Sequence, residues 1–307
     1  MRRVFVLAFI FLLALVHAPA QSWSPLKSDL LFMSNKEGNA EIYIQKGETR
    51  EWVNLTNHPD PDNWPAWSPD GKRVVFQRRT SGSFDLWVVN VHGSNQTQLT
   101  NNPDHEYIPS WSPDGRFITF TSWRKEPADT GRAPHIYVMN SDGTGQRRLV
   151  AQTVNTSAGA EWSPDGKYIV YSRRLQGEGA DIFIAKSDGT DERRVTETDS
   201  YNGSPVFSPD GSKITFYFDT GKGAQIVVMN LDGSGRRVLV AEGYNWHPRW
   251  SRDGQWITYT AYASDDPKNL EIFAVSVSGS EGALRIAGSP ARESESSWNP
   301  AQISPYK

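Results

Sequence analysis

Cysteine is absent from the 307-residue sequence. That absence excludes disulfide bonds, thiolate metal sites, a cysteine nucleophile and a lipid-modified N-terminal cysteine. Basic residues are not in excess either, because 32 Lys and Arg stand against 35 Asp and Glu. A phosphate-binding surface needs such an excess, so the composition argues against a nucleic-acid partner. Beyond the N-terminus, no apolar run approaches the ~20 residues of a membrane-spanning helix. Burial of apolar surface must therefore hold the fold together.

The first 20 residues have the layout of a secretory signal peptide. Two arginines precede an apolar run over residues 4–16, and the small-residue pattern Ala18-Pro19-Ala20 follows it. We expect cleavage after Ala20, and an uncleaved N-terminal anchor is the alternative. The mature chain, residues 21–307, would then carry a net charge of about −5 and no transmembrane segment. These features predict a periplasmic or secreted protein with a single domain.

Two sequence signatures recur together along the mature chain. The first is Trp-Ser-Pro-Asp-Gly or a close variant, and it returns about every 45 residues. The second is a polar residue followed by an aliphatic-aromatic pair, such as Asp85-Leu86-Trp87, and it keeps the same period. Two signatures in one register indicate an internal repeat. The positions of the first aromatic are Trp23, Trp67, Trp111, Trp162, Phe207, Trp250 and Trp298, so seven marks enclose six units.

Each unit is predicted to form four short strands, here named a to d. In the second unit we expect them at residues 65–68, 73–78, 85–90 and 96–100, which are rich in β-branched and aromatic residues and separated by turn residues. A period of this length with four strands is typical of a β-propeller, whose blades bury their faces against each other. The sequence therefore predicts an all-β, six-bladed β-propeller of four-stranded antiparallel blades.

The repeated Trp-Ser-Pro-Asp-Gly motif suits a structural role. Pro69 presets the backbone at the second turn position, Asp70 tolerates the third and Gly71 suits the fourth, so strand a reverses tightly into strand b. Trp67 lies just before the turn, where one blade would pack against the next. We interpret the motif as architectural and assign no catalytic role to its serine or aspartate.

These motifs resemble the repeat of the TolB propeller family. The matching pieces include "PSWSPDGRFITF" with "HIYVMNSDGTGQRRLV", and "AEWSPDGKYIVY" with "DIFIAKSDGTDERRVT". The resemblance extends from about Trp23 to Trp298 and implies a six-bladed propeller and an exported location. TolB proteins also carry an α/β domain ahead of the propeller. The first repeat here begins close to the predicted cleavage site, so we expect the propeller alone.

Both ends of the repeat array carry an incomplete signature. Near the C-terminus, "ESSWNPAQI" reads as a strand a without a blade of its own. We expect this strand to complete the first blade, because a ring closed in this way has no exposed inner edge. The alternative is that residues 21–24 take that place.

The d–a connections supply the candidate binding residues. In an antiparallel blade the a–b and c–d turns lie on one face of the disc, while the b–c and d–a loops lie on the other. Loop length varies on the second face, which is expected of a binding face in a repeat protein. The acidic and aromatic candidates there are Asp62, Asn63, Glu106, Tyr107, Tyr201, Asn202, Asn245, Trp246, His247, Glu293 and Glu295.

Catalysis is the weaker interpretation. No Gly-x-Ser-x-Gly motif occurs, and the acidic turns lack the ligand spacing of a calcium loop. Some exported propellers of similar repeat type cleave uronate polymers with a histidine-held metal, and the candidate ligands here would be His58, His105, His135 and His247. Their offsets within the repeats differ, so the sequence does not bring them together.

We therefore predict a monomeric, non-catalytic scaffold without a cofactor, which binds an envelope protein or peptide through its loop-rich face. The alternative is a small-molecule or polysaccharide site at the channel mouth, with the chemistry of a metal-dependent lyase as one variant.

Overall fold

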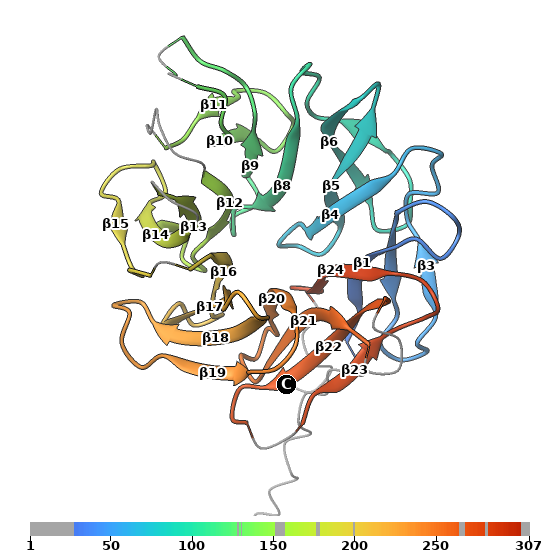
Figure 1. Ribbon diagram of the computed structural model, residues 1–307. Coiled ribbons are helices and arrows are strands. Elements are labelled where there is room, and N and C mark those ends of the chain that lie inside the picture. The colour runs from blue at the N-terminus through green and yellow to red at the C-terminus, as the bar shows by residue number, and fades with distance from the viewer. Residues whose placement is uncertain are drawn as a thin grey trace, which may run out of the picture.

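The described part of the chain consists of β-strands. The computed structural model describes residues 28–301 apart from 128, 130, 151–156, 176–178, 199, 264–267 and 280–281. The predicted signal peptide and Trp23 lie outside the described residues. Within them, 24 strands form six four-stranded sheets arranged around a central axis (Figure 1). No helix in this part of the chain has the length and apolarity needed to cross a bilayer.

Each sheet is one blade, and its strands run from the axis outward in the order a to d (Figure 1). Blade 1 contains β24 (Glu293–Trp298), β1 (Leu30–Ser34), β2 (Glu41–Gln45) and β3 (Trp52–Asn54). Blade 2 contains β4 (Asp62–Trp67), β5 (Arg73–Thr80), β6 (Ser83–Asn90) and β7 (Thr97–Gln98). Blade 3 contains β8 (Glu106–Trp111), β9 (Phe117–Ser122), β10 (His135–Asn140) and β11 (Arg147–Arg148).

The other three blades repeat this order. Blade 4 contains β12 (Ser157–Trp162), β13 (Tyr168–Arg174), β14 (Ala180–Lys186) and β15 (Arg193–Arg194). Blade 5 contains β16 (Asn202–Phe207), β17 (Lys213–Asp219), β18 (Ala224–Asn230) and β19 (Arg237–Val240). Blade 6 contains β20 (Asn245–Trp250), β21 (Trp256–Tyr262), β22 (Leu270–Ser276) and β23 (Leu284–Ala287). Every pairing within a blade is antiparallel, as expected from the repeat.

The C-terminal strand closes the ring. β24 pairs antiparallel with β1, and Leu30 lies opposite Trp298. This confirms the expectation that the C-terminal strand completes the first blade. Leu30 and Phe32 of blade 1 share one buried cluster with Trp256 and Ile272 of blade 6. Closure therefore joins the two ends of the repeat array through both backbone pairing and apolar packing.

The repeated turn is held by its own serine and aspartate. Ser68 Oγ donates to Asp70 Oδ1 at 2.6 Å and accepts from the Arg73 amide at 2.9 Å. Gly71 donates its amide to the Ser68 carbonyl and has a φ of 66°, a conformation that favours glycine. These contacts account for the serine and the aspartate as turn residues. Trp67 is 7 % exposed and packs with Leu31 and Ile44 of the preceding blade, which places it between blades as predicted.

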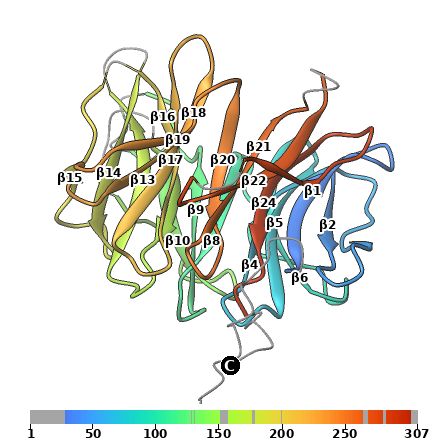
Figure 2. The same ribbon diagram turned by 90° about the horizontal axis from the view of Figure 1, so that it is seen from below.

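The disc has two different faces. The a–b and c–d turns form the one we call the turn face, and the b–c and d–a connections form the one we call the loop face. Figure 2 views the disc from its edge, with β24 running from the loop face to the turn face. The inner strands of all six blades surround the central axis of the disc, and we call the space between them the channel.

Candidate functional site

All six inner strands contain the same bulge. The register with the neighbouring strand shifts between their second and fifth residues. The third residue has a left-handed backbone in every blade, although for β-branched Ile108 (φ 53°) that conformation costs on the order of 1 kcal/mol. Four of these strands have proline as their fourth residue, which lacks the N–H that regular pairing would use. The bulged residues are Trp64, Ile108, Gly159, Ser204, His247 and Glu295.

In five of the six inner strands, the first residue is buried inside the blade. Two of the predicted binding residues form buried ion pairs there: Asp62 with Arg78, and Glu106 with Arg124, each at 2.8 Å. Asp62 and Glu106 are both fully buried, at 0 % exposure. Their carboxylates therefore hold the blade together and present no surface to a partner.

Three further predicted residues occupy the same position in other blades. Asn202 donates to the Ala180 carbonyl at 2.9 Å, and Asn245 donates to the Ala224 carbonyl at 2.7 Å. Glu293 accepts a hydrogen bond from Ser34 Oγ at 3.0 Å. All three side chains are buried. The structure thus places them at the start of the inner strands, where they fasten the d–a connection to the blade, rather than in exposed loops.

The aromatic candidates lie closer to the loop face. Tyr107 accepts a hydrogen bond from Trp123 Nε1 at 2.8 Å, and burial raises the pKa of Tyr107 to about 12. Tyr201 stacks on Tyr217 with ring centroids 5.9 Å apart. A side chain at Gly203 would collide with the Tyr217 ring, at 2.2 Å from an added Cβ. Half-buried Asn63 is the second residue of β4, as Tyr107 is of β8.

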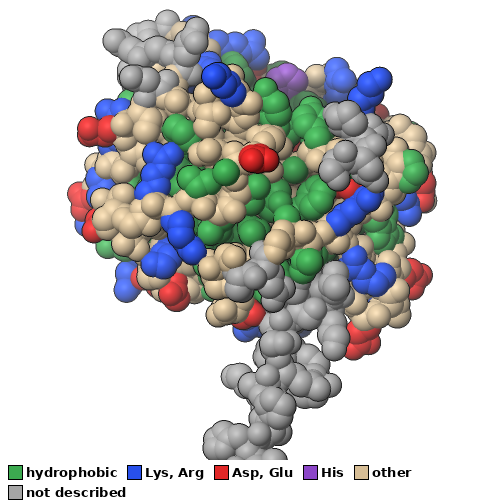
Figure 3. All heavy atoms as spheres, turned by 60° about the horizontal axis from the view of Figure 1, so that its bottom comes forward, with side chains coloured by type: hydrophobic (Ala, Val, Ile, Leu, Met, Phe, Trp, Pro, Cys, Tyr) green, Lys and Arg blue, Asp and Glu red, His purple; other side chains and the backbone are tan. Residues whose placement is uncertain are grey.

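Trp246 belongs to an exposed aromatic cluster that the sequence analysis identified only in part. Its ring stacks on Tyr244 at 5.7 Å and meets Tyr262 edge-on at 5.7 Å. Tyr244 is 46 % exposed and Tyr262 is 43 % exposed. Figure 3 shows hydrophobic side chains gathered over the rim of blades 5 and 6 around an acidic group. We call Tyr244, Trp246 and Tyr262 the aromatic cluster.

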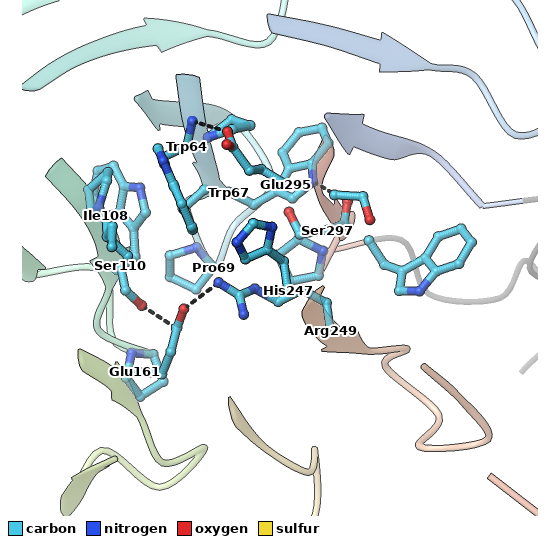
Figure 4. Close-up of a pocket in the computed structure, with 18 residues that line it drawn as sticks. Trp64, Trp67, Pro69, Ile108, Ser110, Glu161, His247, Arg249, Glu295 and Ser297 are labelled. Atoms are coloured by element: carbon cyan, nitrogen blue, oxygen red, sulfur yellow. Dashed lines mark hydrogen bonds and ion pairs between the residues drawn. The ribbon is translucent and has the colours of Figure 1, made fainter. Parts of the chain in front are cut away.

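A cavity of about 300 Å³ occupies the part of the channel nearest the turn face. It extends from the bulged residues Trp64, His247 and Glu295 to the turn prolines Pro69 and Pro113. The Trp64 and His247 rings point toward each other across the channel, with centroids 4.6 Å apart (Figure 4). Glu295 Oε2 accepts a hydrogen bond from the Trp64 amide at 2.7 Å.

An ion pair crosses the channel beside these rings. Arg249 Nη2 of β20 lies 2.9 Å from Glu161 Oε1 of β12. Ser110 Oγ of β8 donates to the other Glu161 oxygen at 2.6 Å, so three blades meet at one carboxylate (Figure 4). The sequence analysis did not select these residues. A signal was present, because Ser110, Glu161 and Arg249 each directly precede the signature tryptophan of a repeat.

Burial shifts the pKa values of Glu295 and His247, the two titratable bulged residues, in opposite directions. Burial raises the pKa of Glu295 to about 7, although Arg292 and Arg249 lie near enough to oppose that shift. Burial together with the nearby Arg249 and Arg292 charges lowers the pKa of His247 to about 3. The imidazole is therefore neutral at pH 7, while Glu295 keeps its proton to a higher pH than an ordinary carboxyl does.

The four histidines considered as metal ligands have separate environments. His58 lies beside Asp60, and His105 accepts a hydrogen bond from the Phe84 amide at 3.2 Å. His135 is buried against Arg148, and His247 lies in the channel. In the part of the chain that the structure describes, no three His, Asp or Glu side chains are grouped to hold a metal ion.

The described residues form a six-bladed β-propeller with polar and aromatic side chains in its central channel and an exposed aromatic cluster. The chain belongs to the TolB beta propeller domain family, whose model matches residues 14–179 and 130–304. It is 34 % identical over 103 residues to the Tol-Pal system protein TolB of Francisella tularensis subsp. mediasiatica. That match covers 33 % of this chain and 23 % of the relative, so the chain spans about a quarter of the relative's length.

Solved structures show the same fold. TolB from Acinetobacter baumannii superimposes with a TM-score of 0.76 at 18 % identity, covering 90 % of this chain and 67 % of that one. Oligogalacturonate lyase from Vibrio parahaemolyticus superimposes with a TM-score of 0.59 at 14 % identity, covering 86 % and 75 %. At these identities the likeness shows the propeller fold alone, and one fold can serve in binding proteins as well as in enzymes.

Proposed function

We propose that this protein is an exported, non-catalytic scaffold that binds an envelope protein or peptide through the loop face. The observation that carries the proposal is the aromatic cluster, because Tyr244 and Tyr262 expose nearly half of their surface beside Trp246. Large aromatic side chains with polar ends are enriched at the centres of protein interfaces. Because the relatives are named as Tol-Pal system proteins, components of that system are the first candidate partners.

The proposal includes an exported location. Cleavage after Ala20 would release the propeller, residues 21–307, into the periplasm or the medium as a monomer. N-terminal sequencing of the protein purified from the periplasmic fraction tests this step. A mature chain that still begins before residue 20, or that stays with the membrane after a high-salt wash, contradicts it.

Capture experiments test the binding face. The triple variant Tyr244→Ala, Trp246→Ala, Tyr262→Ala is expected to keep its melting temperature within a few degrees, because these rings lie outside the buried inter-blade clusters. Cross-linking in envelope extract followed by mass spectrometry identifies the partner that the unchanged protein captures. The triple variant is expected not to capture that partner. Binding of that purified partner, measured by calorimetry, is expected to weaken at least tenfold.

Two controls separate the faces. Tyr168→Ala removes an equally exposed tyrosine, at 42 %, from beside the a–b turn of blade 4. The triple change Asp142→Ala, Asp188→Ala, Asp232→Ala alters three exposed c–d turns of the turn face. Both should leave capture intact. Loss of capture in either control, or retention in the aromatic variant, contradicts the assignment of the face. Cleavage of oligogalacturonate in the presence of Mn²⁺ would contradict the non-catalytic part of the proposal.

A further inference from the structure

Glu295 is a carboxylate without a counter-ion on the wall of the channel cavity. Its Oε2 accepts the Trp64 amide at 2.7 Å, but no described side chain forms an ion pair with it within 4 Å. A half-buried anion in that situation is better stabilised by a cation than by water alone. A cation bound beside Glu295 would therefore stabilise its ionised carboxylate.

The neighbouring side chains do not supply that cation. Arg249 is engaged with Glu161 at 2.9 Å and with the Pro248 carbonyl at 3.1 Å. His247 contributes no charge near neutral pH, because its Nδ1 is buried without a hydrogen-bond partner and its surroundings disfavour the imidazolium. Arg292 also lies near enough to lower the pKa of Glu295, but its side chain is exposed, does not line the cavity and forms no ion pair with Glu295 within 4 Å. With Glu295 ionised, the cavity-lining side chains Glu161, Arg249 and Glu295 together carry one net negative charge.

The cavity walls select the kind of cation. Trp64 lines the cavity together with Glu295, whose carboxylate accepts the Trp64 amide (Figure 4), and aromatic faces attract cations at close range. A hydrated divalent ion needs several oxygen ligands, whereas no group of three carboxylates or histidines exists among the described residues. An alkylammonium group needs one carboxylate and an apolar wall for its stem. Ile108, Pro69 and Pro113 supply such a wall.

We propose that the turn-face end of the channel binds a small alkylammonium ion, with Glu295 as its counter-ion and Trp64 as its aromatic wall. The ligand enters between the turn prolines, and its stem lies along them. About 300 Å³ is at the lower end of the volumes of small-molecule sites, so one short amine fits and a folded partner does not. None of the three residues of the aromatic cluster lines this cavity, and the site does not depend on the scaffold function proposed above.

The ligand chemistry has two sources, a free amine or the side chain of a lysine. n-Butylamine, which is protonated at pH 8, tests the first, and Nα-acetyl-lysine N-methylamide tests the second. n-Butanol has nearly the same shape without the charge. Binding is followed by Trp indole NMR shifts and by calorimetry. Saturable binding of either amine, at least tenfold tighter than that of n-butanol, is expected at pH 8.

Matched variants locate the site. Glu295→Gln keeps an acceptor for the Trp64 amide and removes the charge, so amine binding should weaken at least tenfold. Glu48→Gln removes the same charge from an exposed turn and should leave binding unchanged. Trp64→Leu should weaken binding several-fold. The thermal transition of each variant confirms that it is folded.

Proton release gives a second measurement that is independent of affinity. The charged and titratable groups around Glu295 are His247 and Arg249 on β20, Glu161 on β12 and Arg292 before β24. A bound cation favours the ionised carboxylate, so calorimetry at pH 6.5 in two buffers of different ionisation heat should detect proton release, which Glu295→Gln abolishes. Equal affinity for amine and alcohol, or full binding by Glu295→Gln, overturns the proposal. Amine shifts confined to the loop face overturn it as well.

Discussion

Glu161 and Arg249 lie 88 residues apart in the sequence and form an ion pair across the central channel, with 2.9 Å between Oε1 and Nη2. Blades 4 and 6 are thereby joined directly, past blade 5. Both side chains are about one-fifth exposed, at 19 % and 20 %, so solvent screens the pair only in part.

A double-mutant cycle measures this connection. Glu161→Gln and Arg249→Met should each lower the free energy of unfolding by roughly 1–2 kcal/mol, since each leaves one partly buried charge without its partner. The coupling energy between them should be on the order of 1 kcal/mol. Urea unfolding of the four proteins checks both values. Strictly additive effects would show that the two charges do not interact in solution.

A substitution at Gly115 tests the interpretation that the repeated turn has a structural role. The φ of Gly115 is 71°, and an added Cβ would lie 3.4 Å from Pro69 Cγ of the neighbouring blade. Gly115→Val forces a β-branched residue into the left-handed region and should lower the stability by roughly 1–3 kcal/mol. Gly131→Val is the control, because a Cβ there meets nothing within 4 Å and the backbone is not left-handed. Loss of partner binding at unchanged stability would instead make the turn a functional site.

Much of the fold was predictable because its information is local and repeated. The turn serine, aspartate and glycine recur with the tryptophan, so strand order, blade number and closure by the C-terminal strand followed from periodicity. Asp62 shows where this reasoning stops. It was read as a loop residue on the channel mouth, whereas its carboxylate pairs with Arg78 inside the blade. Local sequence does not reveal which polar side chain finds a buried partner 16 residues away.

The channel site was predictable only in part. His247 and Glu295 were selected, but as members of the loop-face mouth, whereas both line the cavity that extends to the turn face. The reason is the bulge, because four of the bulged third residues line the cavity: Trp64, Ile108, His247 and Glu295. Trp64 was overlooked for the same reason. The prolines that directly follow Trp64, Ile108, Ser204 and His247 were the available signal, because proline in an inner strand indicates a bulge.

Ring closure is expected to be essential to stability. Removing residues 291–307 deletes β24, exposes the edge of β1 and removes Trp298, which is 6 % exposed, from its cluster. Loss of a buried tryptophan alone costs roughly 3–5 kcal/mol, so the truncated chain should melt far lower and aggregate. The shorter deletion of residues 302–307 keeps β24 and should melt like the full chain. Calorimetry compares them, and a 291–307 deletion that melts within two degrees of the full chain would refute the importance of closure.

The raised pKa of Glu295 predicts how stability responds to pH. In the folded protein this carboxyl holds its proton up to about pH 7, whereas in the unfolded chain it loses the proton near its ordinary value of 4.5. Between those values the folded state binds more protons, so this group stabilises the fold below pH 4.5 and that contribution is lost as pH rises through 7. Glu295→Gln removes the titration and leaves His247 unchanged, so the difference between the two proteins isolates Glu295. We expect the variant to gain roughly 1–3 kcal/mol over the unchanged protein between pH 4.5 and pH 8, with most of the gain complete by pH 7.5. Urea unfolding at half-unit pH intervals measures the difference. A constant difference over this range would mean that Glu295 titrates alike in the folded and unfolded states.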